Sequence, residues 1–198
     1  MCIDFTTSIS TYIFSLISSI YLWNRNHPSD RWFTIFGLTF SSIQLVEALL
    51  HKNLNNKNIN KQLSLILFLI LFLEPLANNV GGILYGNKSF FYKTTLAYIF
   101  YMVYIFTYKF PDDKDLYTSK DCNLQWNWLR KVSNIDWIIF LFFLGIPSFF
   151  YAEPKNHIAF FGGALACTYA EFVSGFRQSG TLWCTLANLL YIGVILAN

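Results

Sequence analysis

The chain consists largely of long apolar stretches that are separated by short polar segments. A helix needs about 20 largely apolar residues to cross the hydrocarbon core of a bilayer, and seven stretches approach or reach that length. The predicted spans are residues 5–23, 32–51, 62–85, 94–110, 135–151, 156–175 and 181–197. We therefore predict an all-α membrane protein, a bundle of seven transmembrane helices that forms one membrane domain over residues 1–198.

The composition supports the membrane class and argues against other classes. Charged residues make up 13% of the chain, whereas a soluble domain carries about 25%. The net charge of +3 is small and its residues lie in the connections rather than on one face, so nucleic-acid binding has no support. The expected partner is the lipid bilayer.

The sequence carries no recognisable metal or cofactor motif. It has no HExxH, which would indicate a zinc metalloprotease, and its last span has no lysine that could hold retinal. Its four cysteines form no CxxC pair, and Cys167 and Cys184 lie within apolar spans. We therefore expect no metal site, no cofactor and no disulfide framework, and we interpret the cysteines as small packing residues.

The longest connection, residues 109–134, ends in a segment that combines tryptophan with basic residues. Trp126 and Trp128 stand just before Arg130 and Lys131. This combination is typical of the headgroup layer of a membrane. We predict that the segment anchors the protein at the membrane interface.

The distribution of lysine and arginine predicts the orientation in the membrane. Seven spans place nine of these residues on the side of the N-terminus and five on the other side. Cytoplasmic loops carry the excess of positive charge, so we predict a cytoplasmic N-terminus. The glycosylation sequence Asn87-Lys-Ser89 then lies on the outer side.

Three glutamates, Glu47, Glu74 and Glu171, lie inside predicted spans. An ionisable group at such depth is costly, and its default interpretation is a functional site. Gln44, Glu47 and His51 share one helix face because they are three and four residues apart. Pro75 follows Glu74 and loosens the helix there, which frees backbone carbonyls.

The depths of the polar residues predict one layer and a path that leads away from it. Glu47 and Glu171 lie at similar depth near the N-terminal side, and Glu74 lies nearer the midplane. Asn78 and Asn79 lie beyond the midplane. The candidates for a ligand or ion pathway are Glu74, Glu171, Glu47, Gln44, His51, Asn78, Asn79, Ser174, Arg177 and Asn188; no catalytic residue is assigned.

The same polar residues have a purely structural interpretation. Polar side chains between membrane helices form hydrogen bonds that stabilise the bundle, by about 0.6 kcal/mol each on average. Glu47 and Arg177 can serve as interfacial charges near helix ends, and so can His51. Small residues at every fourth position, Gly162, Ala166, Ala170 and Ser174, allow close helix approach and a homo-oligomer.

One segment of the chain resembles a known group of proteins. The sequence Ser179-Gly-Thr-Leu-Trp-Cys184, with Glu171 upstream and Trp126-x-Trp-Leu-Arg130 before the fifth span, resembles uncharacterised multi-pass membrane proteins of giant viruses and algae. The richness in Asn, Lys and Ile is similar to that of AT-rich viral genes. The resemblance implies a viral or algal protein in a host or virion membrane, and it implies no activity.

We therefore predict a small channel or transporter that handles protons, cations or a small polar solute, with Glu74 and Glu171 as the main groups. The alternative is a membrane-organising or scaffold protein without transport. A third possibility is an intramembrane lipid-modifying enzyme. Such an enzyme needs an acid/base pair within hydrogen-bonding distance, for which Glu47 with His51, or Glu171 with His51, is the candidate.

Overall fold

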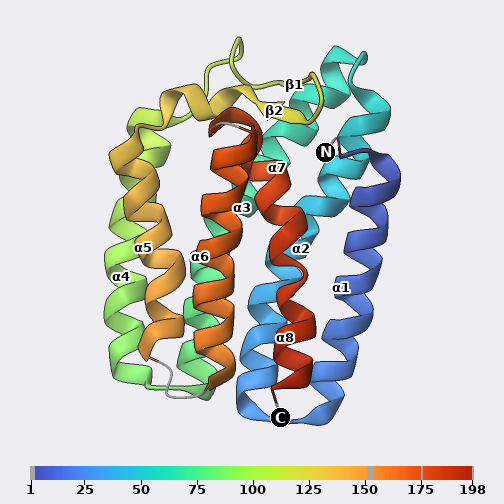
Figure 1. Cartoon of the computed structure of the whole chain (residues 1–198). Coiled ribbons are helices and arrows are strands. Elements are labelled where there is room, and N and C mark those ends of the chain that lie inside the picture. The colour runs from blue at the N-terminus through green and yellow to red at the C-terminus, as the bar shows by residue number, and fades with distance from the viewer. Residues whose placement is uncertain (1–2, 151–153, 175, 198) are drawn as a thin grey trace.

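The computed structural model describes residues 3–150, 154–174 and 176–197, and helices make up about 82% of it. The long helices lie side by side in one bundle (Figure 1). Their bounds are α1 Phe5–Arg25, α2 Pro28–Asn53, α3 Lys57–Tyr85, α4 Lys88–Tyr104, α5 Asn134–Phe150, α6 Pro154–Ser174, α7 Phe176–Ala187 and α8 Leu190–Leu196. A short π-helix, Ile105–Lys109, continues α4.

Three helices of the described residues, α1 to α3, are long and apolar enough to cross a membrane. They correspond to the first three predicted spans, so the helical class of this part is confirmed, and its length and apolar composition are compatible with membrane spans. Polar caps set their ends: Asp4 accepts the backbone N–H of Thr7 at the start of α1, and Asn56 accepts that of Ile59 at the start of α3. The Thr7 N–H holds the pKa of the Asp4 carboxyl below its ordinary value.

A β-hairpin closes one end of the bundle (Figure 1), although the sequence predicts only helices. Its strands are β1, Thr118–Lys120, and β2, Leu124–Trp126, and they pair antiparallel with Thr118 opposite Trp126. A 3₁₀ helix, Asn127–Lys131, follows β2. We call this end of the molecule the hairpin end.

The prediction that Trp126 and Trp128 anchor the protein in the headgroup layer is wrong. Both rings are fully buried and stack on each other with their centroids 5.6 Å apart. The Trp128 ring also packs in a T-shaped arrangement with Phe68 of α3, with the two ring planes 89° apart. Burial of these two large aromatic rings, with Trp128 against α3, stabilises the hairpin on the bundle.

The predicted last span is interrupted. The structure divides it into α7 and α8, with a turn at Asn188 and Leu189. Asn188 Nδ2 donates to the Cys184 carbonyl at 2.6 Å, which is the carbonyl that a continuous helix would offer to the Asn188 backbone N–H. The side chain thus competes with the helical hydrogen bond at the point where the helix breaks.

The interpretation of the cysteines as packing residues is wrong for Cys122, which follows β1 and is disulfide-bonded. Cys184, by contrast, is a buried free thiol, as its position in an apolar span predicts. No CxxC spacing surrounds Cys122 in the sequence. The local sequence therefore does not predict this disulfide, which forms only when folding brings a second cysteine close.

Candidate functional site

Glu47 lies on α2 near the hairpin end and is fully buried. Gln44, one turn earlier, donates from Nε2 to Glu47 Oε2 at 2.8 Å. The Thr185 hydroxyl on α7 approaches Gln44 Oε1 at 3.4 Å. The predicted pair of Gln44 and Glu47 is therefore present, and it connects α2 with α7.

The hairpin covers the Glu47 carboxyl group. The hydroxyl of Thr181, on α7, and the indole of Trp126 both lie beside this carboxyl. The Trp126 geometry falls outside that of a hydrogen bond, so Glu47 Oε1 and Trp126 Nε1 have no partner among the described residues. One buried carboxyl oxygen is thus left without a hydrogen bond in the part of the chain that the structure describes.

Glu74, on α3, is also fully buried, and neither of its carboxyl oxygens has a hydrogen-bond partner among the described residues. Tyr98 of α4 lies within electrostatic range of this carboxyl. The Tyr98 hydroxyl, however, donates to the Phe72 carbonyl at 2.8 Å.

Cys184 of α7 lies within electrostatic range of both Glu47 and Glu74. The two carboxyl groups, on neighbouring helices, therefore share one neighbour in the interior of the bundle. The sequence predicts Glu74 to stand apart from Glu47, near the midplane. In the structure, one buried thiol lies within electrostatic range of both carboxyl groups.

Asn78 and Asn79 form contacts between helices. Asn78 Nδ2 donates to the Leu144 carbonyl of α5 at 2.7 Å. Asn79 Oδ1 accepts from the Thr94 hydroxyl of α4 at 2.9 Å. Both side chains retain one unpartnered polar atom, Asn78 Oδ1 and Asn79 Nδ2, within the described residues. These two asparagines fix α3 against its neighbours, in agreement with the structural interpretation.

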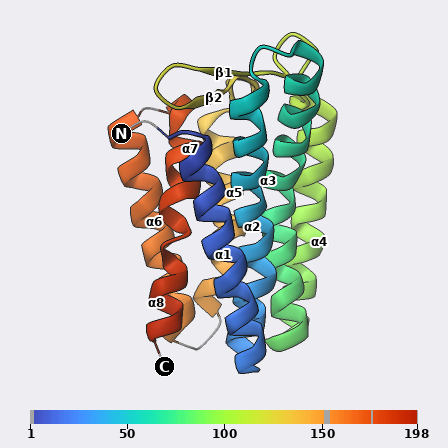
Figure 2. The same ribbon diagram turned by 90° about the vertical axis from the view of Figure 1, so that its right-hand side faces the viewer.

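Asn188 and His51 make contacts with parts of the chain other than Gln44 and Glu47. Asn188 Oδ1 accepts from the Ser15 hydroxyl of α1 at 2.5 Å, where α1 runs beside the C-terminal part of the chain (Figure 2). His51 lies within electrostatic range of Asp4 and Lys120, and its ring nitrogens have no hydrogen-bond partner in the described part. Asn188 thus bonds to α1, whereas His51 lies near the charged groups of Asp4 and Lys120.

The remaining predicted residues of that layer are Glu171, Ser174 and Arg177. Glu171 and Ser174 belong to α6 and Arg177 belongs to α7, but their side chains lie outside the described residues. The stripe of small residues on α6 is used within the molecule: a side chain on Gly162 would overlap Leu190 of α8.

Sequence reasoning missed Thr181, Thr185 and Trp126 as neighbours of the carboxyl groups. A signal for the two threonines was present, because Thr181, Thr185 and Asn188 follow one another at spacings of four and three on one helix face. No group of three or more His, Cys, Asp or Glu that could hold a metal ion occurs in the described part of the chain. No protein-family model, curated protein or solved structure matches this chain.

Proposed function

We propose that the chain is a seven-span membrane protein that transports protons or small cations, with Glu74 and Glu47 as the groups that bind them. Helices α1 to α6 supply six spans in this proposal, and α7 together with α8 supplies the seventh. The lengths and apolar composition of α1, α2 and α3 support the membrane location.

The observation that carries the proposal is the isolation of Glu74. A buried polar group normally has a hydrogen-bond partner, and a charged group buried without one is strongly destabilising. Both Glu74 oxygens lack such a partner among the described residues. A proton or a bound cation neutralises a carboxyl group in this position, and exchange of that proton or cation is the chemistry of transport.

Glu47 supplies a second binding position on the same route. The Cys184 thiol lies within electrostatic range of both Glu47 and Glu74, and the indole of Trp126 in the hairpin lies beside the Glu47 carboxyl group. A proton or cation that passes between Glu74 and the hairpin end therefore meets Glu47. The hairpin then closes the route at this end, and its movement would open it.

The test is flux into sealed proteoliposomes that contain a pH-sensitive dye. Glu74→Gln keeps the size of the side chain and removes its acid group, so we expect loss of proton flux. Leu73→Gln is the matched control, because Leu73 is the preceding residue and faces outward, 45% exposed. It places the same amide on the outer face of α3 and should leave the flux unchanged.

Infrared spectroscopy provides a second measurement on the same variants. A protonated Glu74 contributes a carboxylic acid C=O band that disappears in Glu74→Gln and persists in Leu73→Gln. Equal flux in the wild type and Glu74→Gln, with a change in thermal stability alone, would contradict transport and support the alternative, a membrane-organising protein.

The contacts of three asparagines favour a structural role, as in a membrane-organising protein, for part of the predicted polar residues. Asn78 binds α5, Asn79 binds α4 and Asn188 binds α1, and these hydrogen bonds need no ligand. The intramembrane enzyme has less support, because Glu47 and His51 form no hydrogen bond with each other: Glu47 Oε1 and both His51 nitrogens lack partners in the described residues.

A further inference from the structure

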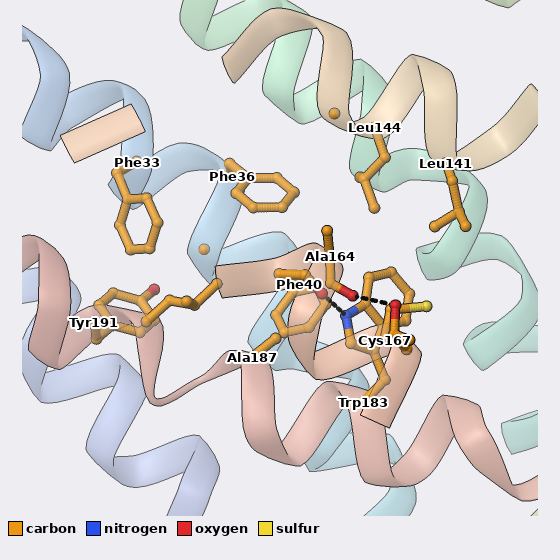
Figure 3. Close-up of a pocket in the computed structure, with 15 residues that line it drawn as sticks. Phe33, Phe36, Phe40, Leu141, Leu144, Ala164, Cys167, Trp183, Ala187 and Tyr191 are labelled. Carbon is orange, nitrogen blue, oxygen red and sulfur yellow. Dashed lines mark hydrogen bonds between the residues drawn. The ribbon is translucent and has the colours of Figure 1, made fainter. Parts of the chain in front are cut away.

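A cavity of about 290 Å³ lies between α2, α5, α6, α7 and α8, and neither Glu47 nor Glu74 lines it. The aromatic rings of Phe33, Phe36 and Phe40 form its wall on α2, and Leu141 and Leu144 face it from α5 (Figure 3). No charged residue is among its described lining residues. An apolar cavity of this kind does not hold ordered water, which needs several polar partners.

The cavity is elongated along the helices. Its wall on α2 extends from Phe33 to Phe40, and its wall on the C-terminal helices extends from Trp183 to Tyr191. At about 1.5 Å per residue these stretches cover roughly 10 and 12 Å along the helix axes. The long dimension of the cavity is therefore parallel to the helices, as are the hydrocarbon chains around a membrane-spanning bundle.

The cavity opens on the outer surface of α6. Ala164 and Thr168 line it and are themselves exposed. Their exposed neighbours are apolar: Leu165 is 71% exposed and Phe161 is 56% exposed. In the seven-span arrangement proposed above, on which this step depends, the mouth of the cavity faces hydrocarbon rather than water.

A contact between α6 and α7 keeps the two helices together without filling the space. Trp183 Nε1 donates to the Gly163 carbonyl at 3.2 Å (Figure 3). Gly163 has no side chain, and a Cβ placed there would have Leu190 Cδ1 at 3.8 Å as its nearest contact. The wall of α6 is therefore open next to the mouth.

We propose that this cavity binds one acyl chain of a membrane lipid, which enters past the face of α6 that carries Ala164 and Thr168 and lies parallel to the helices. The volume of about 290 Å³ is roughly twice that of an engineered apolar cavity of about 150 Å³ that stays dry and binds benzene. The occupant comes from the bilayer because the mouth opens to it, and the apolar walls select a hydrocarbon chain over a headgroup.

The experiment uses the full chain in vesicles of phosphatidylcholine whose palmitoyl chain carries a photoreactive diazirine. After irradiation, mass spectrometry locates the adducts. We expect them to concentrate on lining residues such as Cys167 and Ala187. Ala164→Phe and Thr168→Phe place a ring in the mouth and should reduce this labelling about tenfold, the factor that corresponds to about 1.4 kcal/mol of binding free energy.

Leu165→Phe is the matched control, because it adds a ring to the neighbouring residue on the outer face and leaves the mouth open. Adducts spread evenly over the outward-facing residues, or lining adducts that persist in both mouth variants, would overturn the proposal. Thr168→Phe decides the matter if Ala164→Phe does not fold. Glu74→Gln should retain the labelling, so failure of the transport proposal and failure of lipid binding are distinguishable.

Discussion

The carboxamide of Asn60, on α3, pairs with both backbone groups of Thr118, on β1. Asn60 Oδ1 accepts the Thr118 N–H at 2.9 Å, and Asn60 Nδ2 donates to the Thr118 carbonyl at 2.9 Å. The side chain thus acts as an additional backbone partner for the first strand of the hairpin. A third contact, between the Ser64 and Thr118 hydroxyls at 2.8 Å, fixes the hairpin at the same point.

The first prediction concerns Asn60→Ala. This change leaves the buried N–H and carbonyl of Thr118 without their partner, and an unsatisfied buried group costs about 1–3 kcal/mol. We expect the hairpin to open more often, with faster hydrogen exchange at residues 118–126, while the helices keep their protection. Asn53→Ala is the control, because the Asn53 side chain donates to the Leu49 carbonyl of its own helix. Unchanged exchange in the hairpin would refute the prediction.

The second prediction compares two glycine-to-alanine changes. A Cβ at Gly37 would overlap the phenol of Tyr191, which is buried and bonded to the Ser19 hydroxyl at 2.6 Å. Overpacking of this kind costs about 1–3 kcal/mol. At Gly163 the nearest atom would be Leu190 Cδ1 at 3.8 Å, so alanine fits there. It stabilises the folded protein by about 0.4–1 kcal/mol because it lowers the conformational entropy of the unfolded chain.

Thermal unfolding in detergent, followed by tryptophan fluorescence, measures both variants. We expect the midpoint to fall for Gly37→Ala and to rise slightly for Gly163→Ala. Equal shifts in the two variants would show that the close contact with Tyr191 is unimportant for stability.

The helices could be predicted from the sequence, whereas the hairpin could not. The spacing and length of the apolar stretches are local properties, and they match α1, α2 and α3 closely. The hairpin has strands of only three residues each, and its position depends on Asn60 and Phe68, which precede it by about sixty residues of chain. A tryptophan buried against such distant partners has the same local sequence as one at a membrane interface.

The carboxyl groups could likewise be predicted as unusual, but their surroundings could not. Glu47 and Glu74 are identified by charge within an apolar stretch, which is visible locally. Their shared neighbour Cys184 depends on the packing of α7 against α2, and the contact of Gln44 with Thr185 joins residues 141 positions apart. The spacing of polar residues within each helix predicts a face, and the partner of that face depends on the order of helices in the bundle.

The third prediction concerns the end of the bundle away from the hairpin. Arg25 donates from two guanidinium nitrogens to the Asp30 carboxylate, and a third donates to the Ile195 carbonyl at 3.1 Å. One side chain thus joins the ends of α1 and α8 to the start of α2. Arg25→Ala removes this guanidinium from a fully buried carboxylate, and breaking a buried pair in this way costs about 3–5 kcal/mol.

We expect the double variant Arg25→Ala with Asp30→Ala to recover part of that loss, because the buried charge is then absent as well. Chemical denaturation of the solubilised protein gives the free energies of unfolding for the wild type, the two single variants Arg25→Ala and Asp30→Ala, and the double variant. A double variant that is less stable than Arg25→Ala would contradict the explanation.

The fourth prediction concerns orientation. The charge bias predicts the hairpin end on the cytoplasmic side, yet Cys122 at that end is disulfide-bonded, and disulfides persist mainly in oxidising compartments. Asn87, which caps the start of α4 through the Phe90 N–H, lies at the opposite end of the bundle from the hairpin (Figure 1). We expect the hairpin end to face the oxidising side, and Asn87 then remains unglycosylated.

Two measurements on the protein expressed in microsomes check this expectation together. Maleimide labelling of the denatured protein should reveal new thiols only after reduction, and Cys122→Ser should remove that dependence. Endoglycosidase treatment should leave the mobility of the wild type equal to that of Asn87→Gln. A glycosylated Asn87 with a reduced Cys122 would instead support the charge-based orientation, because the two sites lie at opposite ends of the bundle and both cannot face the oxidising compartment.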